Sequence, residues 1–225
     1  MSSSAPLGVL MLETRFPRVL GDIGNPASFN FPVRYSIVRG ASPARVVRER
    51  AAGLLEPFIA AARELVEQGC GAISTSCGFL ALFQTQLQAA LPVPVATSSL
   101  LQVAPLQAGL PAGRRVGIIT IDAKALTADH LRGVGAAPDT PIAGVRAAGE
   151  FARAIMGDAA ELDTDQLRAE VLEAGARLVQ AHPEVAALVL ECTNMPPYAA
   201  ALAQASRLPV YDILTLLTRL PRSSA

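Results

Sequence analysis

The chain has 225 residues, which is enough for one large domain or two small ones around a substantial buried core. About half of its residues are apolar (51%), and 19 basic side chains match 19 acidic ones, so the charge balance gives no support to nucleic-acid binding. No signal-type segment or bilayer-spanning apolar run is found, which predicts a cytoplasmic protein without a membrane partner.

Three cysteines in such a chain are expected to stay reduced, which leaves their thiols available for chemistry. With no Cys-x-x-Cys pair and only two histidines, the sequence predicts no metal site. His130 falls in a helical pattern and His182 in a loop, and both are interpreted as structural or surface residues.

The first predicted strand, Leu7–Leu12, leads into a long segment from Glu13 to about Gly40 that is expected to be irregular because of its prolines and glycines. A long loop at the carboxyl end of a strand in an α/β protein is usually functional. Its candidate polar contacts are Glu13, Thr14, Arg15, Asp22 and Asn25. The guanidinium of Arg15 suits bidentate binding of a carboxylate, and a solvated loop arginine is the equal alternative.

An apolar stripe at helical spacing predicts a helix that begins at Ser42-Pro43 and ends at Gly69, with a kink or break at Pro57. The later elements alternate: strand 72–75, helix 79–90, strand 93–96, helix 100–108, strand 115–121, helix 122–131, strand 141–145, helix 149–156, a helix from Asp163 to about Ala181, and strand 188–190. Because these strands are apolar on both faces, we expect an α/β fold with parallel sheets flanked by helices.

Two cysteines follow predicted strands in the same way. One strand leads through Thr75 and Ser76 to Cys77 and Gly78, and the other through Glu191 to Cys192, Thr193 and Asn194. A thiol between the end of a strand and the positive end of a helix is expected to have a lowered pKa. Cys70 lies at the opposite end of its strand and is interpreted as a packing residue.

The pattern of strand, cysteine and helix recurs after 115 residues, and each half opens on an apolar strand that contains a glycine, Gly8 or Gly117. The chain is therefore expected to form two similar subdomains related by a pseudo-twofold, with the active site in the cleft between them. Residues 1–102, with 210–225 packing back onto them, would form the first half and residues 103–209 the second. Two ordinary buried cysteines remain the alternative interpretation.

Two thiols that face one cleft suit the removal of a proton from one side of a carbon and its delivery to the other side. The resulting carbanion or enediolate needs hydrogen-bond donors near its carboxylate. Backbone N–H groups at the helix starts, with Ser76, Thr193 and Asn194, are reasonable donors. No lysine motif for pyridoxal phosphate is identifiable, which agrees with a mechanism without a cofactor.

These two cysteine segments, in two similar α/β halves, resemble the aspartate/glutamate racemase superfamily, which includes hydantoin racemases, maleate isomerases and arylmalonate decarboxylases. The resemblance implies two-base proton transfer between Cys77 and Cys192 with no cofactor, and a site lined by Thr75, Ser76, Gly78, Thr120, Thr193 and Asn194. Three positions differ from the common motifs. Gly78 replaces an asparagine, Glu191 a glycine and Asn194 a histidine.

The function predicted in this way is a cofactor-independent racemase or epimerase of an amino acid or a related small carboxylate. The alternatives are a decarboxylase or cis-trans isomerase in the same cleft, a binding protein without turnover, and a redox pair of thiols. A homodimer is the default expectation for the assembly.

Overall fold

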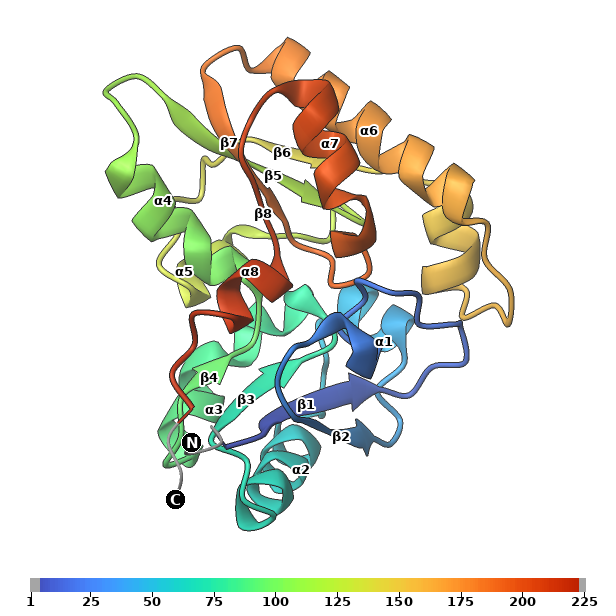
Figure 1. Ribbon diagram of the computed structural model, residues 1–225, viewed down its shortest axis with the longest axis vertical. Helices are drawn as coiled ribbons and strands as arrows, with labels where there is room; N and C mark the ends of the chain where they lie inside the picture. Colours follow the sequence, from blue (N-terminus) through green and yellow to red (C-terminus); the bar gives the residue numbers. More distant parts are fainter. Residues whose placement is uncertain (1–4, 223–225) are drawn as a thin grey trace.

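The computed structural model describes residues 5–222, which fold into two four-stranded parallel sheets with helices packed against them (Figure 1). The strands are β1 (Leu7–Leu12), β2 (Val33–Val38), β3 (Ala72–Thr75), β4 (Val95–Ala96), β5 (Arg115–Thr120), β6 (Ile142–Gly144), β7 (Val185–Leu190) and β8 (Val210–Tyr211). The helices are α1 (Pro43–Arg48), α2 (Leu55–Glu67), α3 (Gln84–Ala90), α4 (Val103–Gly109), α5 (Ala128–Gly133), α6 (Thr164–Ala181), α7 (Ala199–Ser206) and α8 (Ile213–Leu217).

The two sheets have the same topology. Their strand orders are β2-β1-β3-β4 and β6-β5-β7-β8, and every pair of neighbouring strands is parallel. The predicted α/β fold with two similar halves is therefore confirmed. Because all strands of a parallel sheet end at one edge, β3 and β7 bring their carboxyl ends, and the cysteines beyond them, to equivalent places.

Two glycines leave room for a helix against the first strand of each half. A Cβ at Gly8 in β1 would lie 2.6 Å from the Ile73 side chain of β3 and 3.1 Å from the Leu65 side chain of α2, and one at Gly117 in β5 would lie 2.8 Å from the Leu178 side chain of α6. A larger residue at either position would require these side chains to shift. The repeat seen in the sequence thus reflects the same packing requirement in both halves.

The segment from Glu13 to Gly40 was expected to be irregular throughout, and this is wrong for its last third. Residues 33–38 form β2, which pairs in register with all of β1. The predicted helix from Ser42 to Gly69 is two helices, since residues 49–54 separate α1 from α2. Arg50 and Ala51 in that break have positive φ angles of 55° and 53°, and Pro57 lies in the first turn of α2, where proline is tolerated.

In the second half, α6 begins where the sequence predicted, and Asp163 caps it through hydrogen bonds from the backbone N–H groups of Asp165 and Gln166. The predicted helix 122–131 is shorter, since only residues 128–133 are helical. Residues 151–156 form a π-helix, a rare element often found near functional sites. No helix within residues 5–222 combines the length and the apolar composition that crossing a bilayer requires.

Candidate active site

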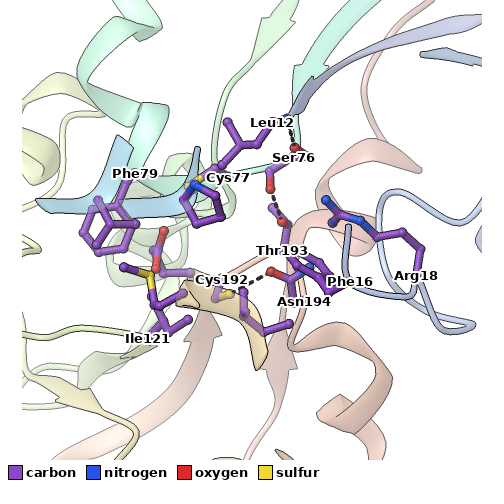
Figure 2. A pocket seen from close by; sticks show the side chains of 16 residues that line it. Leu12, Phe16, Arg18, Ser76, Cys77, Phe79, Ile121, Cys192, Thr193 and Asn194 are labelled. Atoms are coloured by element: carbon purple, nitrogen blue, oxygen red, sulfur yellow. Dashed lines mark hydrogen bonds between the residues drawn. The ribbon is translucent and has the colours of Figure 1, made fainter. Parts of the chain in front are cut away.

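Cys77 and Cys192 occupy equivalent positions, each two residues beyond the third strand of its half. Both side chains line one small cavity between the halves, and Figure 2 shows them together in it. Cys192 is buried, whereas Cys77 is partly exposed. The strand-end positions of the two cysteines, expected from the sequence, therefore lead to a single shared site.

The wall of the cavity is mainly apolar. It includes Leu12, Phe16, Val47, Ile121, Ile155 and Met156, which come from the end of β1, the β1–β2 loop, α1, the residue after β5 and the π-helix. The space itself is about 20 Å³, which is room for about one water molecule. A substrate therefore requires these elements to move apart.

A polar network surrounds Cys192. Its sulfur donates to Oδ1 of Asn194 (3.5 Å), and Nδ2 of Asn194 donates to Oδ2 of Asp22 (2.6 Å). The other carboxylate oxygen of Asp22 accepts from Nη1 of Arg18 (3.2 Å), and this ion pair is almost fully buried. The guanidinium of Arg18 also lies 4.2 Å from the ring centre of Phe16. Arg18 is thus a cation held at the cavity wall.

Two further hydrogen bonds lie beside the thiols, one between the halves and one within the first half (Figure 2). The Thr193 hydroxyl donates to the backbone carbonyl of Ser76 (2.6 Å), and the Ser76 hydroxyl accepts from the backbone N–H of Leu12 (2.8 Å). Residues from both strand ends are therefore tied together at the floor of the site.

Glu191 is fully buried directly before Cys192. Its backbone N–H extends the β5–β7 pairing to Ile119 (2.8 Å), and its Oε2 accepts from the Thr120 hydroxyl (2.7 Å). Its Oε1 has no partner among the described residues and lies against Gly78, where a Cβ would overlap it. Burial raises the pKa of Glu191 to about 8, although the Thr120 hydrogen bond lowers it.

The pKa values of both thiols are raised, which contradicts the expectation from the helix starts. Burial is the main cause at both cysteines, followed by the nearby Glu191 carboxyl. The backbone N–H groups of Phe79 and Asn194 lower the pKa of Cys77 and Cys192 respectively, but they do not outweigh burial. In the closed cavity both groups are therefore thiols.

Most of the predicted site residues lie close to the cysteines. Ser76, Gly78, Thr193 and Asn194 line the cavity. Thr120 contacts it through Glu191, and Thr75 lies behind the first thiol, where its hydroxyl donates to the carbonyls of Thr97 (2.6 Å) and Cys77 (3.0 Å). Within residues 5–222, no group of three or more His, Cys, Asp or Glu side chains is placed to hold a metal ion.

Arg15 and Asn25 do not line the cavity, so the structure gives no support to their predicted roles. Arg15 is largely exposed and pairs with Asp158 of the second half (3.2 Å). Asn25 caps the short 3-10 helix 26–28 through a bond to the backbone N–H of Ala27 (2.9 Å). The cation at the cavity is Arg18, which the sequence analysis missed although it is three residues from Arg15.

Solved structures share this architecture. The Gly74Cys mutant of arylmalonate decarboxylase matches with a TM-score of 0.57 and 20% identity, over 91% of this chain and 87% of that chain. Glutamate racemase isoform RacE1 from Bacillus anthracis matches with a TM-score of 0.56 and 17% identity, over 92% of this chain and 76% of that chain. An aspartate racemase homologue from Pyrococcus horikoshii OT3 matches with a TM-score of 0.53 and 14% identity, over 95% of this chain and 96% of that chain. The fold is that of the aspartate/glutamate racemase superfamily.

Curated proteins that are similar to this chain in sequence include dimethylsulfoniopropionate lyases. Dimethylsulfoniopropionate lyases 7 and 6 of Emiliania huxleyi (strain CCMP1516) are 29% and 30% identical to it over 93% of its length. A dimethylsulfoniopropionate lyase of Durusdinium sp. clade D is 26% identical over 93%. The chain covers 64% and 57% of the two Emiliania proteins, which is about three-fifths of their length. No family model matches the chain.

Proposed function

We propose that this chain is a cofactor-independent enzyme that uses a cysteine to remove a proton from the carbon next to a carboxylate. The observation that carries the proposal is the pair of thiols, one from each half, on the wall of one closed cavity. A thiolate in such a site is a suitable general base, and the second thiol is a suitable acid. We propose further that the reaction is the cleavage of dimethylsulfoniopropionate, the substrate named in its sequence relatives.

The chemistry of that substrate fits proton removal. The carbon next to its carboxylate carries the proton, and the next carbon carries a dimethylsulfonium group. A thiolate takes the proton as the C–H bond breaks, and the released electron pair forms the C=C bond of acrylate. The C–S bond breaks at the same time, and neutral dimethyl sulfide leaves with the electrons of that bond. No oxidant, reductant or cofactor is needed.

The cavity wall offers a partner for each end of a small sulfonium carboxylate. The Arg18 guanidinium and the polar groups of Ser76 and Asn194 suit the carboxylate. The ring of Phe79 suits the methyl groups and the positive charge of the sulfonium, whereas the ring of Phe16 is already next to the Arg18 guanidinium. Since the cavity has room for only about one water, binding must widen it.

A racemase or epimerase is the second candidate. It is favoured by the equivalence of Cys77 and Cys192, because reversible inversion of a carbon centre needs a base on each side. Such an enzyme depends on both thiols, whereas elimination needs one base and no reprotonation of carbon. The dependence on each cysteine therefore separates the two candidates.

The test is an assay of the purified chain with dimethylsulfoniopropionate, in which dimethyl sulfide is measured by gas chromatography and acrylate by NMR. A parallel screen of amino acids, hydantoins and malonates in deuterated water detects proton exchange at carbon. Dimethyl sulfide release that is lost in a cysteine variant supports the lyase. Exchange without release, lost in both Cys77→Ser and Cys192→Ser, supports the racemase. Activity unchanged in both variants would rule out thiol chemistry.

A further inference from the structure

Glu191 is a buried carboxyl without a counter-ion. Its side chain lines the cavity, and none of the arginines, lysines or histidines within residues 5–222 forms an ion pair with it. The cation on the cavity wall, Arg18, is paired with Asp22. A buried carboxylate without a cation is strongly disfavoured, so the uncharged acid is the form expected here.

The hydrogen bond to Thr120 leaves Oε1 as the other oxygen of the acid. With the Thr120 hydroxyl donating to Oε2 at 2.7 Å, Oε2 is the accepting oxygen and the proton of the neutral acid is assigned to Oε1. Oε1 is buried and has no partner among the described residues. A buried O–H donor without an acceptor is rare in a native protein and calls for an explanation.

The surroundings of Oε1 point to a ligand as its partner. It lies against Gly78, between the segment that carries Cys77 and the segment that carries Cys192. A substrate whose carbon reaches a thiol would bring its carboxylate into the same small cavity.

We infer that Glu191 is a catalytic residue that, as a neutral acid, donates a hydrogen bond from Oε1 to a carboxylate oxygen of the substrate. The inference rests on the proposed proton-removal function. Negative charge builds up on that oxygen when the neighbouring carbon loses its proton, so a preorganised donor stabilises the enediolate more than the bound substrate. A neutral acid achieves this without adding a negative charge beside the thiolate.

The raised pKa of Glu191, about 8, agrees with this role. The titratable and charged groups around the cavity are Cys77 from the first half, Cys192 on the same segment, and the Arg18–Asp22 pair from the β1–β2 loop. Both thiols have raised pKa values, so near neutral pH Glu191 is the group that changes charge first as the pH rises.

The test is the binding of propionate, measured by calorimetry between about pH 6 and about pH 9.5, since binding to a neutral acid must weaken as that acid ionises. In the unmodified chain the Kd should be constant at low pH and rise about tenfold per pH unit above the pKa of about 8. Glu191→Gln keeps a donor in place, so its Kd should stay within about threefold at low pH and show no rise near pH 8. Glu191→Leu has no donor and should bind propionate about tenfold more weakly at every pH below 8.

The matched control is Glu170→Gln. It makes the same change at a buried carboxyl that does not line the cavity, so the pH dependence of propionate binding should be preserved.

Propionate cannot turn over, so this result is independent of whether the chain is a lyase or a racemase. The inference is overturned if propionate does not bind at any pH, if Glu191→Gln keeps the rise near pH 8, or if it binds as weakly as Glu191→Leu. If the unmodified chain binds propionate as expected but releases no dimethyl sulfide from dimethylsulfoniopropionate, only the lyase proposal is contradicted.

Discussion

The two halves of the molecule share a scaffold but give their cysteines different surroundings. Cys77 is followed by Gly78 and Phe79, and the Phe79 ring packs edge-on against His130 with its centre 5.2 Å away. Cys192 is followed by Thr193 and Asn194 and belongs to a hydrogen-bonded network. The duplication sets where the sulfurs lie, and the residues after them set what each sulfur can do.

The charged groups near the two thiols also differ between the halves. Arg18 favours the thiolate of Cys77, although burial and Glu191 still raise its pKa. At Cys192 the carboxyl groups of Glu191 and Asp22 and the other cysteine all raise the pKa further. Cys77 is therefore expected to act as the base, while Cys192 stays protonated and donates to Asn194. This asymmetry favours a reaction with one base.

The largest expected effect comes from replacing each cysteine in turn. Cys77→Ser should lower kcat/KM for dimethyl sulfide release by about a thousandfold, since a general base contributes about 10²–10⁴ in rate. Cys192→Ser should lower it by only about tenfold, because elimination does not return a proton to carbon. Steady-state kinetics measures both values. Equal losses would remove the asymmetry and support two-base racemisation, and the reverse order would exchange the roles of the thiols.

The network beside Cys192 can be broken at its buried ion pair. Asp22→Asn leaves the Arg18 charge buried without a counter-ion and should lower the free energy of unfolding by about 3 kcal/mol. Asp158→Asn is the matched control, because its partner Arg15 is 78% exposed, and it should cost less than about 1 kcal/mol. Denaturant unfolding measures both. Equal losses of unfolding free energy in the two variants would mean that burial of the network does not add to the stability of the chain.

The sequence was sufficient where the signal is local. The apolar strands, the recurring cysteines and the capping of α6 at Asp163 depend on residues near one another in the chain. The edge strand β2 was missed because it carries polar Arg34 and Ser36 and follows a segment rich in proline and glycine. Its pairing with β1 is a long-range interaction that a local pattern does not reveal.

The other errors come from tertiary contacts and burial that the local sequence pattern does not show. The break between α1 and α2 is held by Arg50, which donates to Thr127 (3.1 Å) and Asp129 (2.8 Å) of the second half. Arg15 is largely exposed and pairs with Asp158, whereas Arg18 is largely buried and pairs with Asp22. The helix starts suggested low thiol pKa values, but burial in the cavity is visible only in three dimensions.

Glu191 should make stability depend on pH. Its pKa in the folded chain is raised from the ordinary 4.5 to about 8, so its favourable contribution is complete below 4.5 and is lost as the pH rises through 8. Over that window the unmodified chain should steadily lose unfolding free energy relative to Glu191→Gln, at no more than about 1.4 kcal/mol per pH unit. Denaturant unfolding at several pH values measures the difference. Parallel curves for the two proteins would mean that Glu191 ionises normally.

The smallest expected effect tests where the two halves touch. Gly78→Ala places a Cβ where it overlaps Oε1 and the backbone carbonyl of Glu191, and it should cost about 1–2 kcal/mol of unfolding free energy. Gly109→Ala is the control, since nothing lies within 4 Å of the added Cβ, and it should be neutral or slightly stabilising.

The double variant Gly78→Ala/Glu191→Ala divides that cost between side chain and backbone. Removing the carboxyl relieves only the overlap with Oε1, so the part of the Gly78→Ala cost that disappears measures how closely the carboxyl fits against glycine. A recovery of more than half would mean that the glycine after the first cysteine and the glutamate before the second form a matched pair. A cost unchanged by the second substitution would place the restriction on the backbone of the second half and leave the carboxyl free to move.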